Sequence, residues 1–83
     1  ELLLYPNPAN GSVILKTGEN EIPVSITICN VQGAVLDRIM HPKANAAGEI
    51  KLEVAHLRPG LYLVVSMDET GQTSIGRLVI AGN

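Results

Sequence analysis

Glycine and proline residues divide this chain into seven short apolar segments, and this division limits the folds that it can adopt. The 83 residues include 8 glycines and 5 prolines, which stand between apolar stretches rather than in one low-complexity run. Short segments with turn signals about every ten residues are typical of a β-sandwich. We therefore expect an all-β, immunoglobulin-like antiparallel β-sandwich of about seven strands. The predicted strands are residues 2–5, 12–16, 24–30, 34–40, 49–54, 61–67 and 74–80.

Two of these segments alternate between apolar and polar side chains. Side chains of a β-strand point to opposite faces in turn, so each of these segments has one buried and one solvent-facing side. Residues 61–65 are apolar at every position, which predicts a central strand covered on both faces. In residues 34–40 the apolar positions change parity, which predicts a β-bulge. The alternating apolar positions are Val24, Ile26, Ile28, Ile50, Leu52 and Val54.

Turn-forming residues are predicted to connect the strands. Pro6, Asn7 and Pro8 fix backbone angles and remove hydrogen-bond donors, so we expect a turn over residues 6–11. Gly33 stands where a tight hairpin needs a residue with positive φ. Two further connections, a hairpin and a surface loop, are predicted at residues 68–71 and 41–48.

The charge and the aromatic content argue against two classes of binding protein. The chain has 6 Lys+Arg against 8 Asp+Glu, a formal charge of −2, and neither Phe nor Trp. A nucleic-acid-binding surface needs a basic stripe with stacking aromatic side chains, so we expect no nucleic-acid partner. Sugar-binding sites use exposed aromatic faces, and only Tyr5 and Tyr62 are present. The longest apolar runs are also far shorter than the ~20 residues of a membrane-spanning helix.

The side chains that usually carry catalysis or bind metals are scattered along the chain. His41 and His56 fall in a predicted loop and near a strand end, without the carboxylate spacing of a ligand set, so we expect both to be solvated. Cys29 is the only cysteine, which leaves no internal disulfide and predicts a plain, partly covered thiol. We therefore expect neither enzymatic activity nor a cofactor or metal site.

Residues 57–62, with the sequence Leu-Arg-Pro-Gly-Leu-Tyr, form the most informative local motif. Pro59 and Gly60 predict a turn directly before the strand that carries Tyr62. This arrangement resembles the tyrosine corner of immunoglobulin-like sandwiches, in which the hydroxyl binds upstream backbone. The structural interpretation is a tyrosine that packs and caps the turn, and the alternative is a direct contact in recognition.

Four motifs follow one another in order over nearly the whole chain: a Tyr-Pro-Asn-Pro opening, an apolar strand that leads to a glycine hairpin, a Gly-x-Tyr segment and a basic-apolar last strand. In this order and at these intervals they resemble the C-terminal sorting domain of proteins that the type IX secretion system of Bacteroidetes exports. No single motif is diagnostic, because Pro-Asn-Pro and Pro-Gly turns are common. The motifs occupy residues 4–9, 24–33, 57–62 and 77–80.

The resemblance implies that the module is a secretion signal rather than a catalyst. In such proteins a cargo domain precedes the signal, passes through the periplasm and is taken across the outer membrane by a translocon that reads the signal. A sortase-like peptidase usually removes the signal, and the cargo is released or anchored to lipopolysaccharide at the cell surface. Since the chain begins with Glu1 rather than Met, we expect residues 1–83 to be a single sorting domain from a longer secreted protein. The implied sorting residues are Gly60, Tyr62, Gly71, Arg77, Leu78, Val79 and Ile80, and the structural turn residues are Pro6, Asn7, Pro8, Gly33 and Pro59.

The last predicted strand, residues 74–80, suggests a physical route to recognition. A terminal strand offers unpaired N–H and C=O groups that a partner can extend, which also leaves self-association through an edge open. Arg77 is expected to project opposite to Leu78, while Leu78 and Ile80 anchor the strand in the core. One alternative is a plain core strand on which Arg77 only favours solubility. Another is that the whole module is a non-catalytic immunoglobulin- or fibronectin-III-like accessory or adhesion module of an extracellular enzyme.

Overall fold

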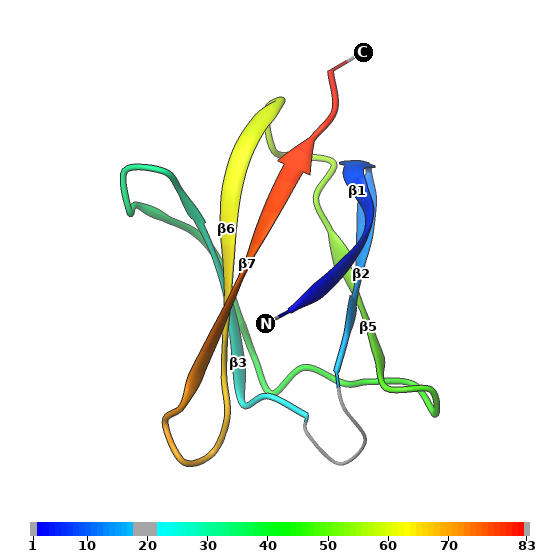
Figure 1. Cartoon of the computed structure of the whole chain (residues 1–83), viewed down its shortest axis with the longest axis vertical. Coiled ribbons are helices and arrows are strands. Elements are labelled where there is room, and N and C mark those ends of the chain that lie inside the picture. The colour runs from blue at the N-terminus through cyan, green and yellow to red at the C-terminus, as the bar shows by residue number, and fades with distance from the viewer. Residues whose placement is uncertain (1, 18–21, 83) are drawn as a thin grey trace.

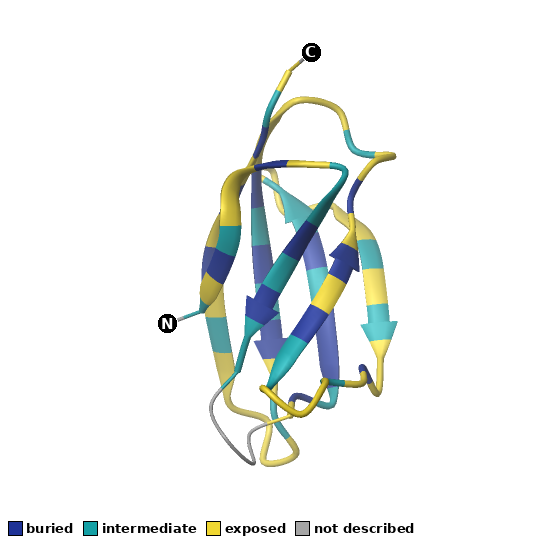
Figure 2. Ribbon diagram, turned by 90° about the vertical axis from the view of Figure 1, so that its right-hand side faces the viewer, coloured by how far each residue is buried: buried dark blue, intermediate teal, exposed yellow. Residues whose placement is uncertain are grey.

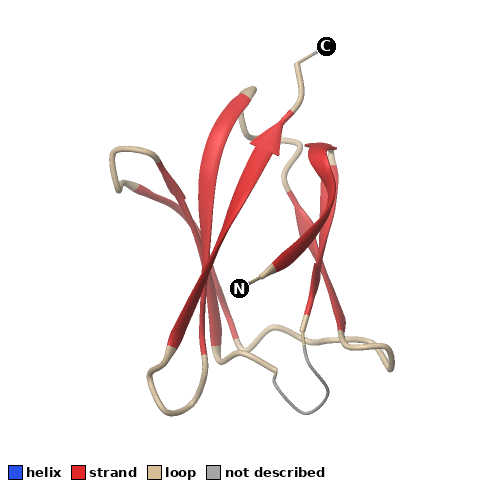
Figure 3. Ribbon diagram, in the orientation of Figure 1, coloured by secondary structure: helices blue, strands red, loops and turns tan. Residues whose placement is uncertain are grey.

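The computed structural model describes residues 2–17 and 22–82, and these residues form seven β-strands (Figure 1). The described residues contain strands and loops and no helix (Figure 3), and accordingly none that could cross a membrane. Six of the seven strands follow the predicted segments closely, whereas the first extends well beyond its predicted end at residue 5. They are β1 (Leu3–Asn10), β2 (Ser12–Lys16), β3 (Ser25–Asn30), β4 (Val35–Met40), β5 (Glu49–Glu53), β6 (Gly60–Met67) and β7 (Thr73–Ile80).

The strands form two sheets that pack face to face. One sheet contains β1, β2 and β5, and the other contains β4, β3, β6 and β7 in that order. Every pair of neighbours within each sheet is antiparallel. Figure 1 shows the four-stranded sheet on the left and the three-stranded sheet on the right. The predicted all-β, immunoglobulin-like sandwich is confirmed.

Strand β1 joins the two sheets, which makes the turn predicted over residues 6–11 wrong. β1 pairs with β2 as far as Tyr5, then the register breaks, and Ala9 pairs in parallel with Ile80 of β7. Proline has no N–H to donate, so the ladder with β2 cannot continue through this segment. The chain stays extended while it crosses to the other sheet, and it turns only at Gly11, where φ is 92°. The residues that lie in the strand instead of in a turn are Pro6, Asn7 and Pro8.

The hydrophobic core lies between the sheets, and burial alternates along the strands that enclose it (Figure 2). In β5, Ile50 and Leu52 are buried while Lys51 is exposed, which confirms the predicted alternation. Full burial of one such aliphatic side chain contributes roughly 1.5–3 kcal/mol, so a few residues from each sheet supply most of the stability. The largest fully buried side chains are Leu15, Ile26, Ile28, Leu52, Leu78, Val13, Val54 and Val64.

Strand β3 follows its predicted alternation with one exception. Ile26 and Ile28 face the core, as expected. Ser25, expected to face solvent, is buried, because its cross-strand neighbours are Met40 and Met67, whose side chains are longer than its own. The small polar residue is thus covered within the outer face of the sheet.

Strand β6 is central in its sheet, between β3 and β7, but only one of its faces is covered. Tyr62 and Val64 face the core, whereas Leu61 on the other face is 43% exposed. The prediction of a strand covered on both faces is therefore wrong. A run of apolar residues does not by itself show whether a second layer packs on the strand, and none of the described residues forms such a layer here.

The predicted bulge and hairpins are confirmed. Ile28 pairs with Asp37 and Cys29 with Val35, so β4 contains one extra residue at this point. Gly33 in the β3–β4 hairpin has φ of 90°. Residues 41–48 form the predicted loop between β4 and β5.

Candidate recognition surface

Strand β7, the predicted recognition strand, lies inside the sandwich rather than at its edge. It pairs along its full length with β6, and on its other side it meets β1. The strands at the two ends of the combined ladder are β4 and β5. The expectation that the last strand offers a free edge is therefore wrong over residues 77–81, where the end of β1 covers the edge.

Most of this cover comes from the side chain of Asn7. Its amide Nδ2 donates a hydrogen bond to the backbone oxygen of Arg77 (2.8 Å), and the backbone N–H of Val79 donates to its Oδ1 (2.9 Å). Two residues further along each strand, the N–H of Ala81 donates to the oxygen of Ala9 (2.8 Å). The side-chain amide thus takes the place of a peptide group in the ladder, between two prolines that cannot donate. Sequence reasoning missed this function of Asn7, although the Pro-Asn-Pro triplet leaves one side chain with both a donor and an acceptor.

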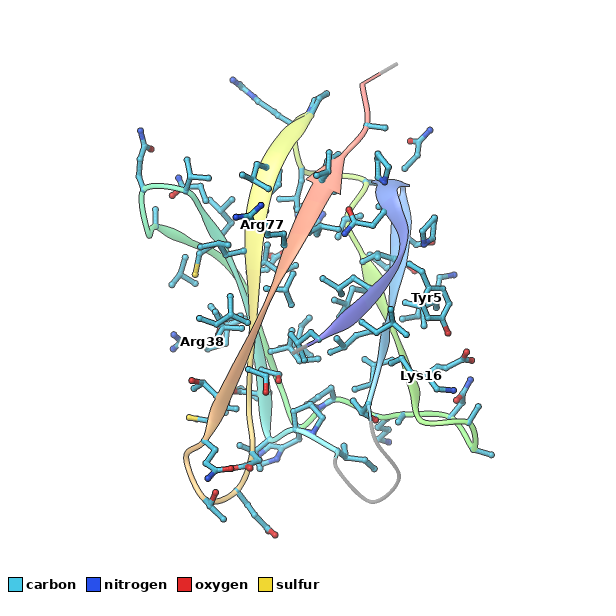
Figure 4. All side chains as sticks on the ribbon, viewed as in Figure 1. Tyr5, Lys16, Arg38 and Arg77 are labelled. Atoms are coloured by element: carbon cyan, nitrogen blue, oxygen red, sulfur yellow. The ribbon has the colours of Figure 1, made fainter. Side chains whose placement is uncertain are left out.

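The two faces of β7 differ as predicted. Leu78 and Ile80 are buried in the core, while Arg77 and Val79 are on the exposed face. Arg77 has no ion pair among residues 2–17 and 22–82. Figure 4 shows its side chain on the outer side of the four-stranded sheet, together with Arg38. The guanidinium group is therefore available to a partner.

Gly76 allows the start of β1 to approach β7. A Cβ atom at this position would lie 3.0 Å from Leu2 Cβ and 3.1 Å from Leu4 Cδ1. Beside this contact an open hollow of about 610 Å³ separates the beginning of β1 from β7, with Leu3 and Arg77 among its lining residues. The two strands therefore touch at Gly76 and at Ala9, and between these contacts the Asn7 side chain joins them in place of a backbone ladder.

Tyr62 forms the predicted tyrosine corner. Its ring is buried, and its hydroxyl donates a hydrogen bond of 2.5 Å to the backbone oxygen of Arg58, four residues upstream. Gly60 has φ of 152°, which favours glycine, and Pro59 lies within 3.7 Å of the position that a Cβ on Gly82 would occupy. The corner thus holds the turn before β6 against the last residues of the chain.

The candidate sorting residues fall into two places. Gly60 pairs with Ile80, and Tyr62 pairs with Leu78, so these residues and their neighbours lie together where β6 begins and β7 ends. Gly71 belongs to the β6–β7 hairpin at the opposite end of both strands, where φ is 87°. The structure therefore brings six of the seven together and leaves Gly71 apart.

The hairpin that contains Gly71 is stabilised by Asp68. Its Oδ1 accepts hydrogen bonds from the hydroxyl of Thr70 (2.7 Å), from the N–H of Thr70 (2.9 Å) and from the N–H of Gln72 (3.0 Å). These donors stabilise the charged form, the Thr70 hydroxyl most, and they lower the pKa of the Asp68 carboxyl below its ordinary value. The carboxylate therefore serves as an acceptor that orders the turn.

A second polar cluster lies on the outer face of the three-stranded sheet. The Tyr5 hydroxyl donates to Glu49 (2.5 Å), and Asn45 Nδ2 donates to the same carboxylate (3.0 Å). Hydrogen bonding from Asn45, then from Tyr5, lowers the pKa of Glu49, and the bond to Glu49 raises the pKa of the Tyr5 phenol. The cluster links β1 to β5 and to the loop before it, and the arrangement contains no nucleophile next to a base.

The histidines lie apart from these clusters. His56 is half exposed, as expected for a solvated residue, but its Nε2 also contacts Asp37 Oδ2 at 2.5 Å. His41 is exposed at the start of the loop, with φ of 52°. Among residues 2–17 and 22–82 no three His, Cys, Asp or Glu side chains come together in a way that could hold a metal ion.

The fold and this surface define a class of protein: a small β-sandwich module whose last strand is built into the ladder and presents an arginine on the outer face. The family model for the secretion system C-terminal sorting domain matches residues 3–81. The chain belongs to this family, which is a family of sorting signals for type IX secretion and not of enzymes. The resemblance seen in the four sequence motifs is confirmed.

Two further comparisons bear on the fold. No curated protein matches the chain in sequence. Among solved structures, CopC from Methylosinus trichosporium OB3b is similar, with a TM-score of 0.54 and 18% identity over 100% of this chain and 98% of that one. At this level of identity the likeness shows the sandwich fold alone.

Proposed function

We propose that the module is read by the type IX translocon as a folded signal that directs an N-terminal cargo domain of the same chain across the outer membrane. The observation that carries the proposal is the match of the sorting-domain family to residues 3–81. In this proposal residues 1–83 act as one domain of a longer secreted protein, which passes through the periplasm to the cell surface or the medium. A sortase-like peptidase then removes the module, and the cargo is released or anchored to lipopolysaccharide.

The candidate sorting residues are proposed to divide into supporting and contacting groups. Leu78 and Ile80 are buried, and Gly60 and Tyr62 hold the turn beside them, so these residues would act by fixing the position of β7. Arg77 and Val79 are exposed on the same strand and would contact the translocon directly. Gly71 would act only through the hairpin, because it lies at the other end of the strands.

The proposal is tested with a reporter protein that carries this module at its C-terminus, in a bacterium with a type IX system. We expect the wild-type reporter to reach the surface or the medium without the module. Deletion of residues 74–83 also removes buried Leu78 and Ile80, so it tests the fold and the signal together. Arg77→Glu separates them, since an exposed charge contributes little to stability, about 0–1 kcal/mol.

The expected result is a melting temperature near that of the wild type together with reduced export of the Arg77→Glu reporter. Lys51→Glu, on the exposed face of β5, is the matched control and should be exported normally. A mature cargo that retains the module, combined with full export of Arg77→Glu, would instead support the accessory or adhesion module. Self-association, if it uses an edge, would involve β4 or β5, which end the combined ladder.

A further inference from the structure

The outer face of the four-stranded sheet collects most of the large apolar side chains that the molecule exposes. Ten large hydrophobic residues are exposed among the described residues, and six of them lie on this face. Contiguous apolar patches of this kind are uncommon on a monomeric protein and mark interaction surfaces. The six are Val35, Met40, Leu61, Met67, Ile75 and Val79.

The register of the sheet places two arginines on this apolar face. Arg38 of β4 pairs with Thr27, which pairs with Val65 and then with Ile75 of β7, and Arg77 follows two residues later on the same side. Three strand spacings and two residues of rise put the arginine positions about 16 Å apart. Figure 4 shows both side chains on this side of the molecule, with Tyr5 and Lys16 on the opposite side.

The same face carries no acidic side chain to pair with these arginines. Its positions on β3, β4, β6 and β7 contain no Asp or Glu, because Asp37 points to the other face and contacts His56. Neither Arg38 nor Arg77 has an ion pair among residues 2–17 and 22–82. The face is thus apolar, with two unpaired positive charges at opposite sides of its centre.

We infer that this face docks a protein surface that is apolar in its centre and carries carboxylates placed to meet Arg38 and Arg77. A second copy of the chain fits less well, since it would bring four arginines and no carboxylate into one interface. An anionic membrane is also a poorer fit, because lipid binding of this kind uses clusters of about four to eight basic residues. The inference rests on the proposed function, since it takes the partner to be a component of the export machinery. The inference extends the proposed contact surface from Arg77 and Val79 of β7 to Arg38 of β4 and to the outer face of β6.

The first test compares export of the reporter with two charge-reversing double variants. R38E/R77E should lower export by at least about tenfold, the loss expected when a desolvated charge pair is broken, with an unchanged melting temperature. The matched control K43E/K51E makes the same change in net charge at exposed positions outside the face and should be exported within about twofold of wild type. R38E alone should also reduce export, which recognition confined to β7 would not produce.

The second test identifies the partner. A photo-crosslinking amino acid at Ile75 should give an adduct with a protein of the export machinery, and the linked peptide should lie on an apolar surface that contains Asp or Glu. The same amino acid at Lys51, on the other sheet, should give none. The adduct should be lost in R38E/R77E. Sedimentation of the purified module should show a monomer. Flotation with phosphatidylglycerol vesicles should show that the module does not bind the vesicles.

The outcomes separate this inference from the proposed function. If the wild-type reporter is retained in the cell, the proposed function fails. If the wild type and R38E/R77E are exported equally, the function survives and the docking face is wrong. A dimer or vesicle binding that R38E/R77E abolishes would overturn the inferred partner and assign the face to a second copy or to lipid.

Discussion

The Asn7 side chain connects two strands that lie 70 residues apart in the sequence, and it does so with a single amide group. Truncation in Asn7→Ala removes both hydrogen bonds, but water can reach the Arg77 oxygen and the Val79 N–H, because both contacts are exposed. We expect a loss of about 1 kcal/mol, which corresponds to a fall in melting temperature of about 4–8 °C in a domain of this size. Thermal denaturation measures this fall in melting temperature.

Hydrogen exchange tests the cause of this loss. In Asn7→Ala the Val79 amide should exchange faster, while the amides that pair β6 with β7 should not. Thr73→Ala is the control, because it shortens an exposed polar side chain of β7 that makes no side-chain hydrogen bond to the described residues, 2–17 and 22–82. If Val79 exchanges at the same rate in Asn7→Ala and in the wild type, Asn7 does not hold the crossing of β1.

Asp68 makes the stability of the β6–β7 hairpin depend on pH. Its pKa is lowered below the ordinary value of 3.8, chiefly by the Thr70 hydroxyl. A lowered pKa in the folded state means that the stabilisation is present above pH 3.8 and is lost as the pH falls through the folded-state pKa. Asp68→Asn keeps a side-chain oxygen acceptor but does not titrate. Its melting temperature should therefore fall less between pH 5 and pH 2 than that of the wild type, and parallel curves would contradict this.

At the scale of whole elements, the contact between β1 and β7 depends on the absence of a side chain at Gly76. In Gly76→Ala the new methyl group would meet Leu2 and Leu4 at 3.0–3.1 Å, so β1 must shift or the side chains must move. Overpacking of this kind typically costs about 1–3 kcal/mol, and urea denaturation measures it. Gly82→Ala is the matched control, because its methyl group would lie 3.7 Å from Pro59, an ordinary contact.

A double variant shows whether the cost comes from this contact. Leu4→Ala shortens the side chain that Gly76→Ala would crowd, so the two changes together should cost less than the sum of the two separate losses. Additive losses would mean that the cost comes from Leu2 or from the backbone of Gly76 rather than from the Leu4 side chain.

The strands differ in how far they could be predicted from the sequence. Alternation identified β5 and most of β3, because burial of one face determines the pattern. The turn predicted over residues 6–11 is wrong, because local turn preferences contain no information about a partner strand 70 residues away. The outer face of β6 was predicted to be buried, since an apolar run looks the same whether it is covered by the chain itself or left open.

For the molecule as a whole, the order of the motifs predicted the family, the spacing of short apolar segments predicted the fold class, and neither predicted the geometry of the site. Tyr62 was placed correctly because its corner is local, with the acceptor four residues upstream. No sequence motif marks Arg38. Its position on the same face of the sheet as Arg77 follows only from the register of four strands. Surfaces assembled from distant strands can be found only once the pairing is known.

A translocon that recognises the folded module can export only the folded fraction of it. Export should therefore fall when the free energy of unfolding of the whole sandwich falls. Leu78 is fully buried, so Leu78→Ala should cost about 2–5 kcal/mol, a large part of the stability of a small domain. Leu36→Ala makes the same chemical change at a position 43% exposed and should cost much less. We expect export of the reporter to fall for Leu78→Ala in proportion to its folded fraction, measured by urea denaturation of the purified module, and to remain normal for Leu36→Ala. Full export of an unfolded Leu78→Ala module would mean that the translocon reads a linear peptide, and the setting of Arg77 within β7 would then not contribute to recognition.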